Sequence, residues 1–183
     1  MSNRPDNPST VLLHWRRSTS KGAHLCGATA KGVLKGLPLP KEILGFNRFQ
    51  LNIGSYQKQW DPEAHPVDSF HIPKSAHYKL QSGRNPWVID SIAPDFVAAG
   101  YKTSILLDTS RGRGKQGKNW DQASMDIPTG FAGGIKPENV ADRIQEIATK
   151  HPKFFICAES GLRTNDQFDP AKVRACVEAC ITV

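Results

Sequence analysis

Short apolar runs alternate along this chain with longer stretches in which apolar residues recur every three or four positions. Three runs typical of buried strands end in small or acidic residues, at residues 103–108, 129–134 and 154–160. The second and third are each followed by the spacing of an amphipathic helix. Repeated strand–helix units of this kind predict an α/β fold with parallel strands.

The same alternation continues, more weakly, toward the N-terminus. Further strands are expected at 23–27, 48–52 and 77–81, and helices over 28–34 and 85–99, from Pro137, and from Asp169-Pro170. Six strands in sequential order then place 23–27 at one edge of the sheet and 154–160 at the other. A closed (β/α)8 barrel needs eight strands and roughly 200 residues or more. We therefore predict a TIM-type barrel that is incomplete, with about six parallel strands alternating with helices.

The composition of the chain fits a single compact domain. Its 183 residues are 38% hydrophobic, which is enough for one substantial core. We expect one barrel-type domain over 1–183, with the polar residues 1–9 disordered. No apolar run approaches the roughly 20 residues of a membrane span, so we expect a soluble protein with no membrane partner.

Charge and cysteine content limit the partners and the compartment. The chain carries 24 Lys and Arg against 17 Asp and Glu, a formal net charge of +7, which suits an anionic partner such as a phosphorylated metabolite or a nucleic acid. The four cysteines, at positions 26, 157, 176 and 180, lack zinc-like spacing. We expect reduced thiols in the cytoplasm and no metal site.

Motifs in the last 80 or so residues resemble the phosphoribosylanthranilate isomerase family of (β/α) barrels and its uncharacterised relatives. In chain order the matching motifs are Ile-Leu-Leu-Asp at 105–108, Gly-Lys-Asn-Trp-Asp at 117–121, Phe-Ala-Gly-Gly-Ile at 131–135, Lys-Pro-Glu-Asn-Val at 136–140, Ser-Gly at 160–161 and Asp-Pro-Ala-Lys-Val-Arg at 169–174. The resemblance implies an isomerase of tryptophan biosynthesis that converts an aminoaldose into an aminoketose without a cofactor.

The resemblance also assigns roles to individual residues. Asp108 would be the general acid, which requires partial burial to favour its protonated form. The substrate loop would contain Gly117 and Lys118, and the phosphate of a ribose-type ligand would lie against Gly133, Gly134, Ser160 and Gly161. Glycine turns and a following helix start suit a phosphate, because backbone N–H groups can approach it closely. Alternatively, Asp108 only caps a turn or pairs with a nearby arginine.

The general base is the weakest part of this assignment. The family places a cysteine at the end of strand one, and Cys26 in His-Leu-Cys-Gly imitates that motif. Counting back from the eighth strand, however, makes 23–27 the third strand, with two strands expected before Met1. The more common role of such a cysteine is that of a small buried residue at a strand end.

Three alternatives remain open at this point. The chain is a non-catalytic sugar-phosphate-binding barrel, or it is a remnant of a longer enzyme without isomerase activity. The third alternative is nucleic-acid binding through the basic run at 111–118, although a run this short is more often an active-site loop. Two further residues depart from the family. Lys136 stands where a Ser, Thr or Asn cap is usual, and Glu159 puts a carboxylate beside the phosphate site. Exposed edges of an incomplete sheet would favour a homo-oligomer.

Overall fold

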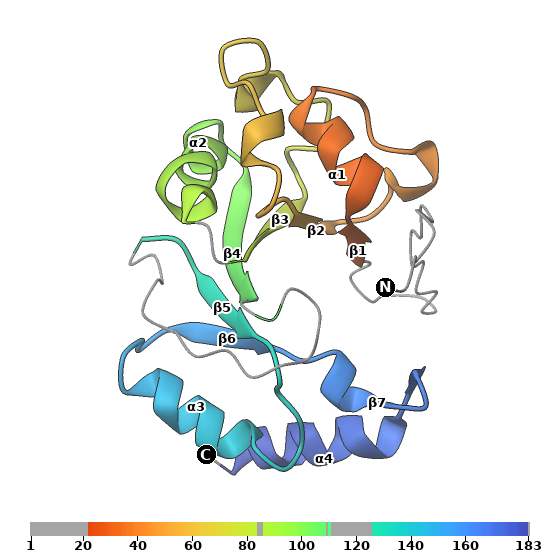
Figure 1. Ribbon diagram of the computed structural model, residues 1–183, viewed down its shortest axis with the longest axis vertical. Helices are drawn as coiled ribbons and strands as arrows, with labels where there is room; N and C mark the ends of the chain where they lie inside the picture. Colours follow the sequence, from red (N-terminus) through yellow and green to blue (C-terminus); the bar gives the residue numbers. More distant parts are fainter. Residues whose placement is uncertain (1–21, 84–85, 109, 111–125, 183) are drawn as a thin grey trace. The chain divides into compact units, whose positions relative to one another are not determined.

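Six parallel strands form one sheet in the computed structural model, which describes residues 22–83, 86–108, 110 and 126–182. The strand order follows the chain from β1 to β6 (Figure 1). The strands are β1 (Gly22–Leu25), β2 (Arg48–Asn52), β3 (His77–Ser82), β4 (Lys102–Asp108), β5 (Thr129–Ala132) and β6 (Phe154–Cys157). The α/β class and the sequential order of six strands are confirmed, whereas the barrel stays a prediction.

In the described parts of the chain, four α-helices accompany the strands: α1 (Gly27–Leu34), α2 (Ala93–Ala98), α3 (Val140–Ala148) and α4 (Pro170–Ile181). A π-helical turn at Val88–Ile92 leads directly into α2, so the helix expected over 85–99 is present in two parts. The chain divides into two compact units, Met1–Ser104 and Ile105–Val183, which are described separately below. The expected disorder of residues 1–9 lies outside the described residues.

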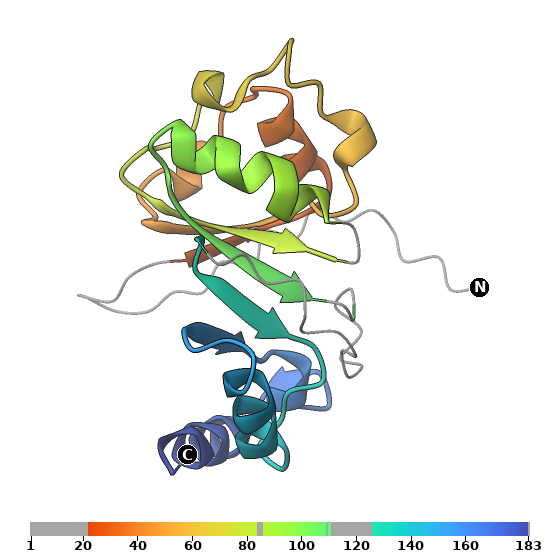
Figure 2. The same cartoon turned by 90° about the vertical axis from the view of Figure 1, so that its left-hand side faces the viewer.

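The first unit packs α1 and α2 on one side of its strands (Figure 2). Residues on alternate positions of β2 and β3 point to opposite faces, and the apolar set is Phe49, Leu51, Tyr78 and Leu80, each no more than 1% exposed. The Tyr78 ring lies 5.5 Å from that of Phe49 and 5.8 Å from that of Phe96 in α2. This aromatic cluster joins the helix layer to the sheet. It leaves the other face of the strands to polar side chains.

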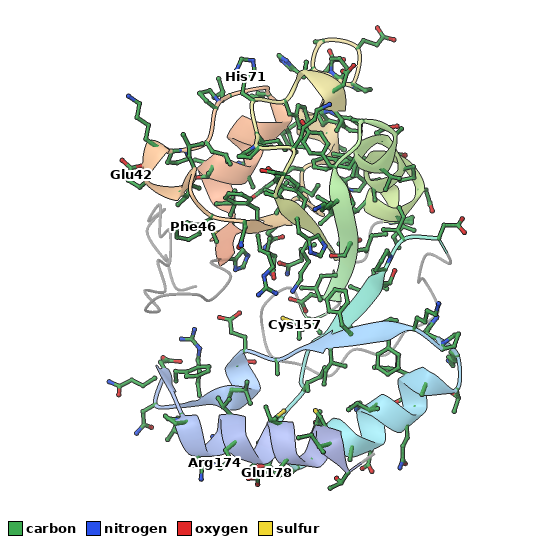
Figure 3. All side chains as sticks on the ribbon, turned by 180° about the vertical axis from the view of Figure 1, so that it is seen from behind. Glu42, Phe46, His71, Cys157, Arg174 and Glu178 are labelled. Carbon is green, nitrogen blue, oxygen red and sulfur yellow. The ribbon has the colours of Figure 1, made fainter. Side chains whose placement is uncertain are left out.

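The second unit is held together by a small apolar core between β6, α3 and α4. Ile135, Val140, Leu162 and Cys176 are buried there, and Ile144, Ile156 and Val173 pack around them. Figure 3 shows Arg174 and Glu178 on the face of α4 turned away from β6. The α4 helix starts as the sequence predicts, because the Asp169 carboxylate accepts hydrogen bonds from the backbone N–H groups of Ala171 and Lys172, 3.0 and 3.3 Å away.

One element of the second unit was not expected from the sequence. A small antiparallel hairpin, β7 (Arg163–Thr164) and β8 (Gln167–Phe168), lies between β6 and α4. Its two turn residues, Asn165 and Asp166, have φ angles of 51° and 62°. Asn and Asp tolerate this left-handed conformation better than other non-glycine residues, so the pair supports a tight two-residue turn.

Candidate functional site

The turn that follows β5 contains two consecutive glycines in conformations that other residues rarely adopt. Gly133 has a φ of 109° and Gly134 a φ of 67°. Any other residue at Gly133 would be strained in this conformation. The predicted Ala-Gly-Gly turn is therefore present, directly after the last residue of the strand, Ala132.

Asn139 holds this turn in place with both ends of its side chain. Its Nδ2 donates to the carbonyl oxygen of Gly134 at 2.9 Å, and its Oδ1 accepts from the backbone N–H of Lys136 at 3.0 Å. Residues 136–139 form a turn before α3, which explains why the helix begins at Val140 rather than at Pro137 as predicted. Asn139 is the N-cap residue of α3, but its side chain bonds the turn before the helix and makes no capping hydrogen bond to the helix itself. The sequence signal for this role was Asn139 within Pro-Glu-Asn-Val.

The turn that follows β6 lies directly against the glycine turn. Ser160–Leu162 form one turn of 3-10 helix, and a Cβ atom built on Gly161 would lie 2.0 Å from the carbonyl oxygen of Ile135. Real Cβ atoms essentially never come within 3.0 Å of such an atom. Only glycine allows this approach, so Gly161 brings together the two turns to which the resemblance assigns the phosphate.

Backbone donors of the two turns have no acceptor among the residues that the structure describes. Within the described residues, no hydrogen bond involves the backbone N–H of Gly133, Gly134, Ser160 or Gly161. Such N–H groups, grouped on two adjoining turns, suit an anion. The Lys136 N–H does not belong to this set, because Asn139 occupies it.

Charged side chains around the turns are paired with one another. Glu159 lies 3.2 Å from the Arg163 guanidinium, which offsets the negative charge that the sequence placed beside the phosphate site. Lys136 pairs with Glu138 at 3.8 Å, and both side chains are more than half exposed. Exposed pairs of this kind contribute little to stability. The pair therefore does not hold the Lys136 ammonium group in a fixed position next to the turns.

Asp108 ends β4, one strand away from the glycine turn. It is the register partner of Ala132, the residue before Gly133, so the two backbones are about 4.8 Å apart. The side chain is 6% exposed, and its Oδ1 accepts hydrogen bonds from the Ser110 hydroxyl at 2.6 Å and from the Ser110 N–H at 3.0 Å. Ser110 orients this carboxylate and was not singled out from the sequence.

For the other predicted residues, membership of this group stays a prediction. Cys26 is exposed and lies between β1 and α1, in the first unit, so the expectation of a small buried residue at a strand end is wrong. Its pairing with Asp108 stays a prediction, because the two residues belong to different units. Gly117 and Lys118, the predicted substrate loop, lie outside the described residues, as do Arg111 and Arg113, the arginines near Asp108 in the sequence.

Several other features concern ligands and location. The four cysteines are free thiols, and burial raises the pKa of Cys176, as does the neighbouring Cys180. Among the described side chains, no group of three His, Cys, Asp or Glu residues is arranged to hold a metal ion. None of the helices in the described parts of the chain combines the length and the apolar character that a bilayer span requires.

No known family model, curated protein or solved structure matches the chain. The resemblance to phosphoribosylanthranilate isomerase therefore depends on the motifs quoted above, and membership of that family stays a prediction.

Proposed function

We propose that this chain binds a phosphorylated ribose-type ligand, with the phosphate held by the turns at Gly133-Gly134 and Ser160-Gly161. The observation that carries the proposal is the contact of Gly161 with Ile135, which joins the two turns into one surface. Backbone N–H groups on both turns have no acceptor in the described residues. Donors of this kind bind an oxyanion without a fixed cation.

A catalytic role for Asp108 belongs to the same proposal. The isomerisation of an aminoaldose needs an acid that protonates the ring oxygen and a base that removes the proton from the adjacent carbon, so that the ring C–O bond breaks and an enol amine forms. Asp108 is at the end of the strand next to the glycine turn, which is within reach of the sugar of a ligand whose phosphate lies there. The base would be Cys26, as the resemblance predicts.

The binding proposal is tested by calorimetric titration of ribose 5-phosphate. Ser160→Asp places a carboxylate on an exposed residue of the second turn, and repulsion should weaken binding at least about tenfold. Gln145→Glu adds the same charge on an exposed position of α3 and is the matched control. Equal affinities of the two variants for ribose 5-phosphate would show that the phosphate does not bind at these turns. Substitution of Gly133 is less informative, because its positive φ would strain any other residue.

Catalysis is tested separately from binding. An acid or a base typically contributes about 10²–10⁴-fold to the rate of such a step. A chain with Asp108 but without a paired base should therefore turn over phosphoribosylanthranilate slowly. Asp108→Asn should abolish this slow turnover while ribose 5-phosphate still binds. Rapid turnover that also requires Cys26 would establish the acid–base pair. Turnover unaffected by Asp108→Asn would exclude Asp108 as the acid.

A further inference from the structure

The outer face of α4 is less polar than the exposed face of a helix usually is. Seven residues of this helix are exposed, and five of them are apolar: Pro170, Ala171, Ala175, Val177 and Ile181. The other two are Arg174 and Glu178, which lie on the face turned away from β6 (Figure 3). Val177 is 52% exposed and Ile181 78%. A helix on the surface of a monomer normally turns charged and polar side chains outward.

The other helix of the second unit, α3, has the usual pattern. Its exposed residues are mostly charged or polar: Asp142, Gln145, Glu146 and Ala148. Both helices pack their inner faces on the same small core, so the difference between them lies in their outer faces. The outer face of α4 is therefore apolar surface that lacks the polar cover present on α3.

The two charged residues of this face have no partner among the residues that the structure describes. Neither Arg174 nor Glu178 takes part there in an ion pair or a hydrogen bond, with each other or with another residue. Their order along the helix explains this in part, because a cation four residues before an anion is the weaker arrangement for a pair within one helix. On α3, by contrast, Arg143 and Glu146 are paired. Two opposite charges of α4 therefore remain for a partner.

The spacing of the outer face is self-complementary. Four of its residues recur at intervals of three, four and three positions, which is the spacing of a seam between two paired helices: Ala171, Arg174, Glu178 and Ile181. When two α4 helices lie antiparallel and are centred on position 176, Arg174 of each copy faces Glu178 of the other. At the ends of the pair Ala171 faces Ile181, so a small residue packs against a large one. A two-fold axis repeats every contact, as in most homodimers.

We propose that the outer face of α4 binds a second copy of this chain, as an antiparallel pair of α4 helices joined by two Arg174–Glu178 contacts. Charge complementarity selects this occupant, because the same surface supplies both members of each pair. The antiparallel direction also brings Phe168, which is 61% exposed and precedes α4, to the end of the pair where Ile181 of the second copy lies. The proposal does not depend on the function assigned to the glycine turns.

The size of the contact sets the strength of the dimer. Each α4 helix has 12 residues, and a single pair of such helices is smaller than the interfaces of roughly 1,200–2,000 Å² that hold stable complexes together. Partly exposed ion pairs add little to this. We therefore expect a weak dimer that dissociates reversibly on dilution.

The test is sedimentation of the full chain between about 10 μM and about 1 mM, where the wild type should show a monomer–dimer equilibrium. Arg174→Glu places two carboxylates opposite each other at both contacts and should raise the dissociation constant at least about tenfold. Glu178→Arg should do the same with two guanidinium groups. Asp142→Arg makes the same change of charge on the exposed face of α3 and is the control. It should leave the equilibrium unchanged.

Combination of the two changes separates this helix pair from a general effect of charge. The double variant Arg174→Glu/Glu178→Arg restores opposite charges at both contacts and should dimerise like the wild type. A mixture of the two single variants should form a heterodimer, because each contact then joins a carboxylate to a guanidinium group. Both side chains are exposed, so circular dichroism should show that every variant is folded.

Three results would overturn the proposal. One is a wild-type chain that stays monomeric at about 1 mM. Another is a dimer that neither Arg174→Glu nor Glu178→Arg weakens, since its interface would then lie elsewhere, for example at an edge of the sheet. The third is a double variant that stays monomeric where the wild type is dimeric.

Discussion

Replacement of Gly161 by alanine should weaken both the stability of the second unit and its affinity for phosphate. The added Cβ would lie 2.0 Å from the Ile135 carbonyl oxygen, so the two turns must separate by about 1 Å to restore an allowed contact. Ile135 is 2% exposed and packs in the core with Leu162, so it cannot move without repacking its neighbours. Overpacking of this kind costs about 1–3 kcal/mol.

The assay is urea unfolding followed by tryptophan fluorescence and circular dichroism, with phosphate titration of the folded variant. Gly45→Ala is the control, since a Cβ there would meet no atom within 4 Å and the residue does not have a positive φ. It should leave the free energy of unfolding unchanged or raise it by a few tenths of a kcal/mol. A Gly161→Ala chain as stable as Gly45→Ala would show that the two turns are not in contact. That result would contradict a phosphate site shared by the two turns.

Three further outcomes are expected. Asn139→Ala removes both hydrogen bonds that hold the glycine turn. It should weaken phosphate binding in calorimetry and change the melting temperature little. A lower melting temperature with unchanged phosphate affinity would contradict the role given to Asn139. Burial, and then the charges of nearby cations, lower the pKa of His77 below 6.5. As pH decreases below 6.5 the unfolded chain therefore takes up the proton first, and the free energy of unfolding falls. His77→Gln should flatten this part of a plot of unfolding free energy against pH. The hydrogen bond from Thr164, then that from the Lys172 N–H, lowers the pKa of Asp169, so its stabilising effect is present above pH 3.8 and is lost as pH falls through the folded pKa; Asp169→Ala should lower the melting temperature at pH 7, and an unchanged melting temperature would show that the cap is not formed.

The strands were predictable because their apolar runs are short and distinct. The run ending at Asp108 is buried along its last five residues, and the cap at Asp169 followed by Pro170 marks the start of the last helix. The hairpin around Asn165 was missed because each of its strands has two residues, too few for an alternating pattern. The start of α3 was placed too early because Pro137 is a common first-turn residue, whereas residues 136–139 form a separate turn, closed by the bond from the Asn139 N–H to the Lys136 carbonyl oxygen.

The candidate site was predicted in its residues but not in its contacts. The glycine turn and Gly161 were both identified, yet nothing in the sequence indicates that one touches the backbone beside the other. The sequence allowed Asp108 to cap a turn, and the hydrogen bond from the Ser110 N–H is a cap of this kind. The partner itself was not identified, because a serine two residues away has many possible partners and only the fold selects one.

The sequential strand order has a consequence for how the chain folds as it is synthesised. Each strand from β2 onward pairs first with a neighbour that has already left the ribosome, because strand order and chain order coincide. Among the six described strands, none has to wait for a later one to be inserted beside it. The contacts that each new strand makes with its neighbour therefore offset the entropy lost when it becomes ordered. The first three strands and α1 can assemble before the glycine turns exist, and the N-terminal half can therefore act as the template on which the rest of the sheet is laid down.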